Sequence, residues 1–190
     1  IMCYMVEGKG SKEWELARRL LVEEPALARE LLEMITDVTI DYLLMQRDAG
    51  VAAVQVFDSW AGALSPALYR QWIMPLWERI VNKVINIPMI VFPRAANVPL
   101  QEFAALGNMA IGLDWSVEAS AARAQAPSHT LQGNLDPITL FADHDTIRRA
   151  TRTLIQDLGT QRTIINLGHG ILPSTPVDGA KAFIDEVKNF

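Results

Sequence analysis

A histidine framed by two glycines, Gly168-His169-Gly170, follows the short apolar run Thr163–Leu167. An imidazole changes its protonation state near neutral pH, so it is suited to proton transfer when a protein positions it. If the apolar run is a strand, it could deliver this ring to the mouth of a parallel barrel. A flexible turn that leaves the ring in solvent explains the same residues, so the rest of the chain must decide.

Polar or special residues follow four other apolar runs in the same way: Asp58-Ser59-Trp60, Arg94, Asp114-Trp115 and Gly133-Asn134. The carboxyl ends of the strands converge on one site in a parallel barrel, so these residues are candidates for it. Asp58 and Ser59 point to opposite sides of their strand, which means that at most one faces the site. Either could instead satisfy loop amides, and Asp114 could be a base or an anchor for backbone amides.

Other chemistries find less support. The three histidines, His129, His144 and His169, lack metal-ligand spacing, and the single cysteine, Cys3, excludes a disulfide and a multi-thiolate site, so no metal is predicted. Ser59, His169 and Asp114 could be drawn as a triad, but no GxSxG motif orders them. His144 is expected on the surface, and His129 at the start of a strand, on the face opposite the presumed site. Gly133 suggests that a ligand or another part of the backbone approaches closely there, and Asp136 is predicted to be an N-cap.

Five apolar runs are predicted to be strands covered on both faces: Val51–Phe57, Pro88–Phe92, Met109–Leu113, His129–Gln132 and Thr163–Leu167. The segments between them carry helix signals. Ser11 is a candidate cap, Pro25 begins a helix that stops at Gly50, and Ser65-Pro66 begins an amphipathic helix that Pro75 should kink. Gly107 and Gly159 mark two further helix ends.

This alternation predicts an α/β fold with a parallel sheet, either open or closed into a barrel. The absence of GxGxxG and Walker-type loops disfavours a nucleotide-binding open sheet, and the polar strand ends favour a (β/α)8 barrel. Such a barrel needs eight strands and about 250 residues. The chain therefore supplies about five βα units of it.

Composition limits the partners. The 190 residues are 50% hydrophobic, which suffices for one domain with a sizeable core. No apolar run approaches the roughly 20 residues that span a bilayer, which predicts a soluble protein without a membrane partner. A formal charge of −5 without a basic stripe disfavours nucleic acid.

The motifs YMVEGKGSK (4–12), FDSWAG (57–62), GLDWS (112–116), LQGNLDP (131–137) and NLGHG (166–170) together resemble the uroporphyrinogen decarboxylase family in order and spacing. The resemblance implies a cytoplasmic (or plastid) homodimer with a distorted (β/α)8 barrel, of which residues 1–190 form the C-terminal part. It implies decarboxylation of the four acetate side chains of uroporphyrinogen III to coproporphyrinogen III, in haem or chlorophyll synthesis, without metal or organic cofactor.

The family's substrate contacts fall on Tyr4, Ser59 and His169, with Tyr4 and His169 expected to be catalytic. The glycines beside His169 would let the macrocycle approach. Arg94, and Lys9 within the glycine-rich stretch, could bind a carboxylate or be solvated. The family's central aspartate and main arginines are expected outside this chain.

Two alternatives stand beside this function. A truncated chain could be an inactive binding or structural half. A methyltransferase of the same superfamily is disfavoured, because Gly170 and Ile171 follow His169 where its zinc motif needs a cysteine.

Overall fold

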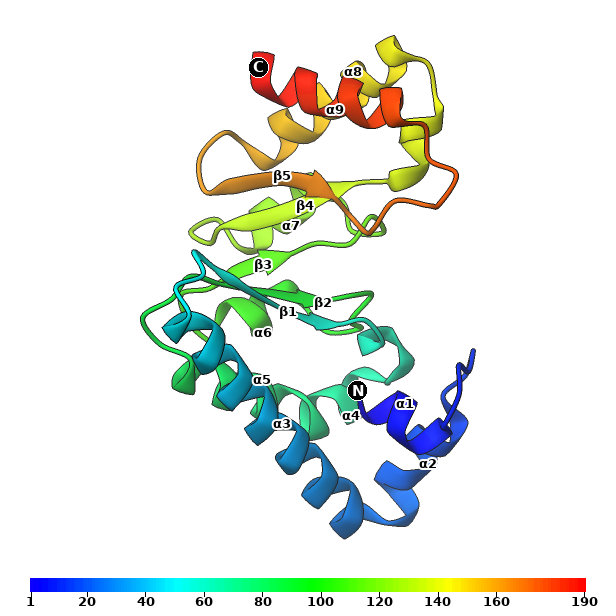
Figure 1. The fold of residues 1–190 in the computed structure, drawn as a ribbon, viewed down its shortest axis with the longest axis vertical. Helices are drawn as coiled ribbons and strands as arrows, with labels where there is room; N and C mark the ends of the chain where they lie inside the picture. Colours follow the sequence, from blue (N-terminus) through cyan, green and yellow to red (C-terminus); the bar gives the residue numbers. More distant parts are fainter.

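The computed structural model describes residues 1–190 and contains one sheet of five parallel strands (Figure 1). They are β1 (Val54–Asp58), β2 (Met89–Pro93), β3 (Ala110–Gly112), β4 (Leu131–Leu135) and β5 (Thr163–Leu167). Each strand pairs with the next one along the chain, in the order β1-β2-β3-β4-β5. This order confirms the predicted α/β fold, with five consecutive units of a (β/α)8-type barrel.

The bounds of β2 and β3 differ from the prediction by one residue at each end, and those of β1 and β4 differ by more. β1 begins at Val54, whose amide bonds to Pro88, while Val51 remains exposed. β4 runs past Gln132, because Gly133 and Asn134 pair with Ile165 and Asn166 of β5. Hydrogen bonding across the ladder, not hydrophobicity, sets where a strand stops.

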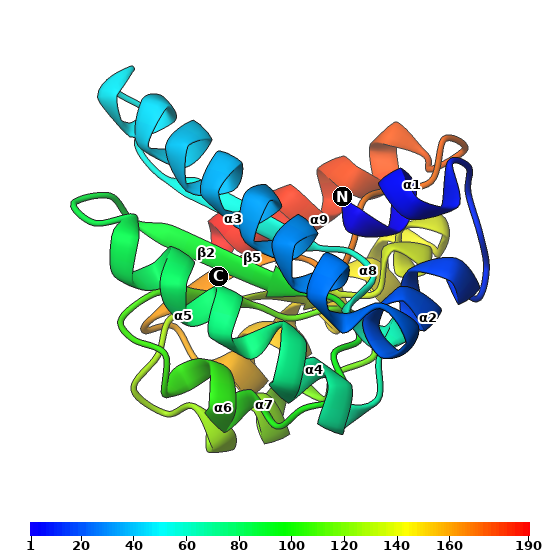
Figure 2. The same ribbon diagram turned by 90° about the horizontal axis from the view of Figure 1, so that it is seen from below.

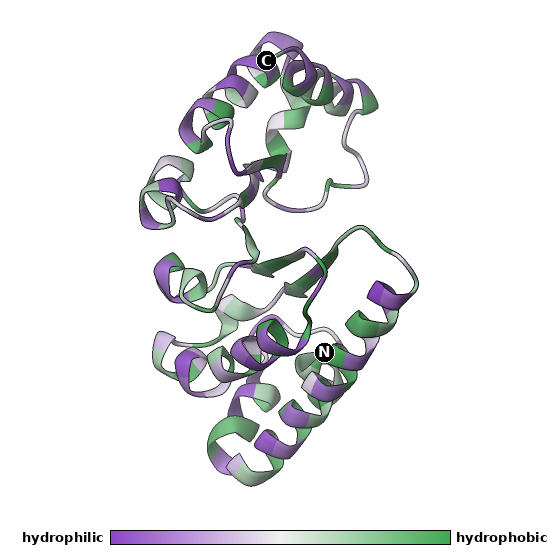
Figure 3. Ribbon diagram, turned by 90° about the vertical axis from the view of Figure 1, so that its left-hand side faces the viewer, coloured by the Kyte–Doolittle hydropathy of each residue, from purple (hydrophilic) through white to green (hydrophobic).

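Helices connect the strands and precede the first of them. They are α1 (Met2–Glu7), α2 (Glu15–Glu23), α3 (Pro25–Asp48), α4 (Pro66–Trp72), α5 (Met74–Lys83), α6 (Leu100–Ala104), α7 (Ala119–Gln125), α8 (His144–Leu158) and α9 (Val177–Asn189), with short 3-10 turns at Ala61–Ala63 (η1) and Pro137–Phe141 (η2). Figure 2 shows α4, α5, α6 and α7 together on one face of the sheet. Figure 3 shows both hydropathy colours along the helices, as expected for amphipathic elements.

Most helix signals act where they were predicted. Pro25 lies in the first turn of α3, Ser65 caps α4 by accepting from the Leu68 amide, and Gly159 ends α8. Asp136 caps η2 by accepting from the Ile138 amide. Gly107 lies beyond the end of α6, in the turn to β3, with a φ of +146°.

Two helix predictions are wrong in detail. Pro75 does not kink one long helix: it lies in the first turn of a separate helix, α5, where its missing N–H costs nothing. Ser11 does not cap α2, and instead accepts from the Trp14 amide. The Glu7 carboxylate occupies the N-terminus of α2, accepting from the Leu16 and Ala17 amides at 2.9 and 3.3 Å.

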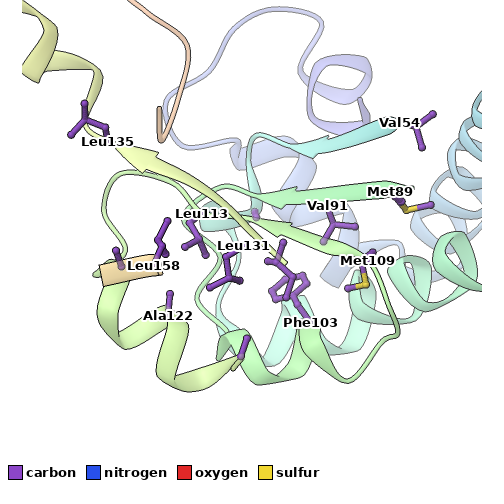
Figure 4. Close-up of a cluster of buried hydrophobic side chains, with 14 of the residues drawn as sticks. Val54, Met89, Val91, Phe103, Met109, Leu113, Ala122, Leu131, Leu135 and Leu158 are labelled. Carbon is purple, nitrogen blue, oxygen red and sulfur yellow. The ribbon is translucent and has the colours of Figure 1, made fainter. Parts of the chain in front are cut away.

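The core lies between the sheet and the helices that follow each strand. Val91 of β2, Ile111 of β3 and Leu131 of β4 are fully buried there. Phe103 of α6 and Ala122 of α7 cover them in the same cluster (Figure 4). The helix-facing side of the sheet is therefore dry, and any site must lie on the other face or at the strand ends. No helix, α3 included, combines the length and apolarity of a membrane-spanning segment.

Both outer strands have an unpaired edge. β1 pairs only with β2, and β5 only with β4. Apolar side chains remain exposed beside these edges, including Phe57 on β1, Ile164 on β5 and Val38 on α3. Open apolar edges of this kind template association with other chains.

We therefore predict that the isolated chain self-associates at micromolar concentration and unfolds without a cooperative transition. Size-exclusion chromatography and thermal unfolding measure this. Ile164→Lys, which places a charge on the β5 edge, should lower the associated fraction severalfold. A monodisperse, cooperatively unfolding 190-residue protein would contradict the prediction.

Candidate active site

The candidate residues gather at the carboxyl ends of the strands. Ser59 and Arg94 follow β1 and β2 directly, Asp114 lies just beyond β3, and His169 just beyond β5. Ladder bonding continues into these segments, since the Arg94 amide donates to Asp58 and the Gly168 amide to Leu135. Figure 1 shows α1, which carries Tyr4, on the same side of the molecule. We call this end of the sheet the mouth.

His169 lies against an aromatic surface. Its ring is exposed and stacks parallel to that of Phe92, with ring centroids 6.4 Å apart and an interplanar angle of 7°. Phe92 in turn contacts Phe57 edge-on at 5.8 Å, and Phe57 is 63% exposed. We call Phe57, Phe92 and His169 the aromatic row. Sequence reasoning missed the two phenylalanines, although they end neighbouring apolar runs and pair in register.

Gly168 is required by packing. A Cβ there would lie 2.2 Å from the Trp115 backbone nitrogen, whereas one at Gly170 would meet nothing within 4 Å. The glycine before His169 thus admits the loop after β3, not a ligand as the resemblance implied. His169 follows a tightly packed residue, which argues against the flexible-turn interpretation.

Asp114 is an anchor and not a base. It is 4% exposed, and its carboxylate accepts from the Ala95 amide at 2.6 Å, the Ser116 amide at 2.8 Å and the Ser116 hydroxyl. The buried Asn134 side chain adds bonds to the carbonyls of Asp114 and Val117 at 2.8 and 2.7 Å. We call the hydrogen bonds of Asp114 and Asn134 the strand-end ties. The three hydrogen bonds to the Asp114 carboxylate occupy the group that a Ser59–His169–Asp114 triad would need.

Asp58 faces the helices. The Tyr69 hydroxyl of α4 donates to Asp58 Oδ2 at 3.0 Å and accepts from Trp77 Nε1 of α5 at 2.9 Å. Burial raises the pKa of Asp58, and the Tyr69 hydrogen bond offsets part of that rise. Burial likewise raises the pKa of Tyr69. Ser59 follows β1, and both Asp58 and Ser59 line the cleft described next.

Tyr4 and Ser59 line the same cleft, which measures about 510 Å³ and is mostly apolar. The Tyr4 ring is 52% exposed and meets Trp14 and Trp60 edge-on at 5.2 and 6.3 Å. The cleft continues along the unpaired edge of β1 toward α3, where a further barrel strand would lie. Its end beside Ser59, which follows β1, is the part that belongs to the mouth.

His169 and Arg94 lie outside this cleft, and Phe57 connects the two regions. Arg94 is half-buried, and neither its guanidinium nor the exposed Lys9 ammonium forms an ion pair or hydrogen bond within the chain. No group of three or more His, Cys, Asp and Glu side chains is arranged to hold a metal.

The remaining histidines lie away from the mouth, as predicted. His144 is the exposed first residue of α8. His129 Nε2 lies 3.2 Å from the Gly107 carbonyl, at the amino ends of β3 and β4. Gly133 makes the predicted close approach, and its neighbour is the Leu113 backbone.

Comparisons with known proteins give a consistent result. The family model described as uroporphyrinogen decarboxylase (URO-D) matches residues 1–190. Uroporphyrinogen decarboxylases of Flavobacterium johnsoniae and Christiangramia forsetii are 43% and 42% identical over 192 residues, covering 100% of this chain and 56% of each relative. That of Geobacter sp. is 40% identical over 188 residues, covering 97% of this chain and 56% of the relative. The chain thus spans a little over half the length of these relatives.

A solved structure, a methyltransferase from Methanosarcina mazei, superposes with a TM-score of 0.79 at 18% identity. The match covers 91% of this chain and 52% of that one. At this identity the likeness supports the fold alone.

Gly168→Ala should destabilise the protein by about 3 kcal/mol or more, because the added methyl overlaps the Trp115 backbone and no flexible side chain can give way. Gly170→Ala is the matched control and should change the free energy of unfolding by less than about 0.5 kcal/mol. Denaturant unfolding measures the difference when each variant is joined to the part of the Flavobacterium johnsoniae relative that this chain does not match, because a free energy of unfolding requires a cooperative transition. Equal stabilities would show that Gly168 is not packed against Trp115.

Proposed function

The chain belongs to the uroporphyrinogen decarboxylase family, and from that premise we propose that it forms the C-terminal part of an enzyme that converts uroporphyrinogen III to coproporphyrinogen III. The aromatic row beside the unpaired Arg94 carries the proposal. Aromatic faces suit pyrrole rings, and a free guanidinium suits a carboxylate. The homodimeric state and cytoplasmic location that the resemblance implies remain predictions.

The reaction needs a proton donor and anchors for several carboxylates. Protonation of a pyrrole carbon lets the ring accept the electron pair of the breaking C–C bond as CO2 leaves. The exocyclic methylene then takes a proton to become a methyl group, and the ring returns its extra proton. His169 and Tyr4 are the residues of this chain that we assign to proton transfer or hydrogen bonding with the substrate, while Ser59 and Arg94 bind it.

The test joins this chain to the part of the Flavobacterium johnsoniae relative that it does not match, which gives what we call the reconstituted barrel. We expect it to release four CO2 per uroporphyrinogen III under anaerobic conditions, with or without a chelator. A folded but inactive reconstituted barrel would favour the binding or structural half. Activity lost to a chelator and restored by zinc would refute the cofactor-free chemistry.

His169→Asn should lower kcat of the reconstituted barrel by about 100-fold, because asparagine keeps the polarity but removes the titratable group. His144→Asn makes the same change at the exposed start of α8 and serves as the control. Steady-state kinetics with coproporphyrinogen as the measured product distinguish the two. Unchanged kinetics for His169→Asn would assign the histidine a structural role only.

Arg94→Ala should raise KM about tenfold, and the increase should shrink at high salt, because screening weakens the carboxylate contact. Thermal stability should stay the same, since the guanidinium has no partner within the chain. Arg148→Ala, which removes a surface ion pair with Asp145, is the control. A lowered Tm with a normal KM would instead assign Arg94 to packing.

A further inference from the structure

Three side chains from three elements form a directional hydrogen-bond relay beneath the mouth. The Trp77 indole can only donate, so the Tyr69 hydroxyl that accepts from it must give its own proton to Asp58. Tyr69 is 0% exposed, and Trp77 lies in the main core cluster. Because both aromatic rings are immobilised by packing, the position of the Asp58 carboxyl is fixed by α4 and α5.

The Asp58 main chain in turn holds the next strand. Its carbonyl accepts from the Arg94 amide at 3.1 Å, and the Arg94 carbonyl accepts from the Gly62 amide at 3.2 Å. Arg94 is thus bonded on both sides to the segment that contains Ser59. A displacement of Asp58 would move both residues that we assign to substrate binding.

Asp58 could instead be a catalytic acid, but its side chain points to the helix side of β1. Val56, two residues earlier on the same side of β1, packs against the buried core with its register partner Val91. On the other side of β1, the Gln55 side chain accepts a hydrogen bond from Gln132 of β4, and Phe57 belongs to the aromatic row. The Asp58 carboxyl therefore lies on the helix side of β1, in the wall of the cleft that Tyr4 and Ser59 also line, with its Oδ2 held by Tyr69.

We propose that Asp58 is a positioning residue, which the Trp77–Tyr69 relay holds so that Ser59 and Arg94 are oriented toward the substrate. The inference rests on the proposed function for the identity of the reaction. The geometry that carries it, two buried aromatic side chains that hold the half-buried Asp58 between two strand ends, does not depend on that identity.

The test compares variants of the reconstituted barrel. Asp58→Asn keeps an oxygen that accepts from Tyr69, so we expect kcat and KM within about threefold of the parent. Asp58→Ala should raise KM at least tenfold with a smaller change in kcat, and Tyr69→Phe should raise KM severalfold while keeping the buried ring.

A double-mutant cycle tests whether Asp58 acts through Ser59. In a Ser59→Ala background, the effect of Asp58→Ala on KM should shrink at least threefold, because the two changes act through one contact. Asp185→Asn, an exposed change on α9, is the control.

Equal losses in Asp58→Asn and Asp58→Ala would make the carboxyl itself catalytic and overturn the proposal. An unchanged KM in Tyr69→Phe, or full additivity with Ser59→Ala, would overturn it too. Amide hydrogen exchange gives a readout besides activity: Tyr69→Phe should speed exchange at Arg94 and Gly62 several-fold, and Asp58→Asn should not. If the parent is folded but inactive, the proposed function fails, while this exchange measurement still decides the positioning role.

Discussion

The buried carboxylate of Asp114 is the constraint on which the mouth depends. A charge taken out of water must be compensated by hydrogen bonds, and Asp114 obtains them from the backbone of two loops. One of these loops contains Arg94 beside Ala95, and the other contains Trp115, against which Gly168 packs. Asn134 extends the same network to β4. The strand-end ties therefore fix the loops that present Arg94 and His169.

This arrangement is compatible with the polycarboxylate site that we propose for a chain of negative net charge. The acidic groups at the mouth are turned inward: Asp58 toward Tyr69 and Asp114 toward backbone amides. Of the aromatic row, Phe57 and His169 remain exposed on either side of the buried Phe92, and the half-buried Arg94 has no partner for its guanidinium. Functional groups on rigid strand ends are held in position more precisely than groups on long loops.

The sequence predicts much of the fold because apolar runs and helix caps are local signals. The five strands, the start of α3 at Pro25 and the cap at Ser65 follow from them. The bounds of β4 do not, because pairing with β5 extends it through Gly133 and Asn134. Ser11 is displaced as a cap by the Glu7 carboxylate, a contact that only folding creates.

The candidate site was predictable in its members but not in its construction. Strand ends followed by polar residues indicated Ser59, Arg94 and His169. The relay from Trp77 through Tyr69 to Asp58 joins three separate elements, so no local pattern reveals it. The reason for Gly168 was also hidden, since the atoms it accommodates belong to Trp115, 53 positions earlier in the sequence.

The most direct test of the central claim, that the mouth binds the macrocycle, is a crystal structure of the reconstituted barrel with coproporphyrinogen bound. We expect a pyrrole ring against Phe57 and His169 of the aromatic row and a substituent carboxylate within about 3.2 Å of the Arg94 guanidinium. Product bound along the β1 edge toward α3, with the aromatic row uncovered, would contradict it.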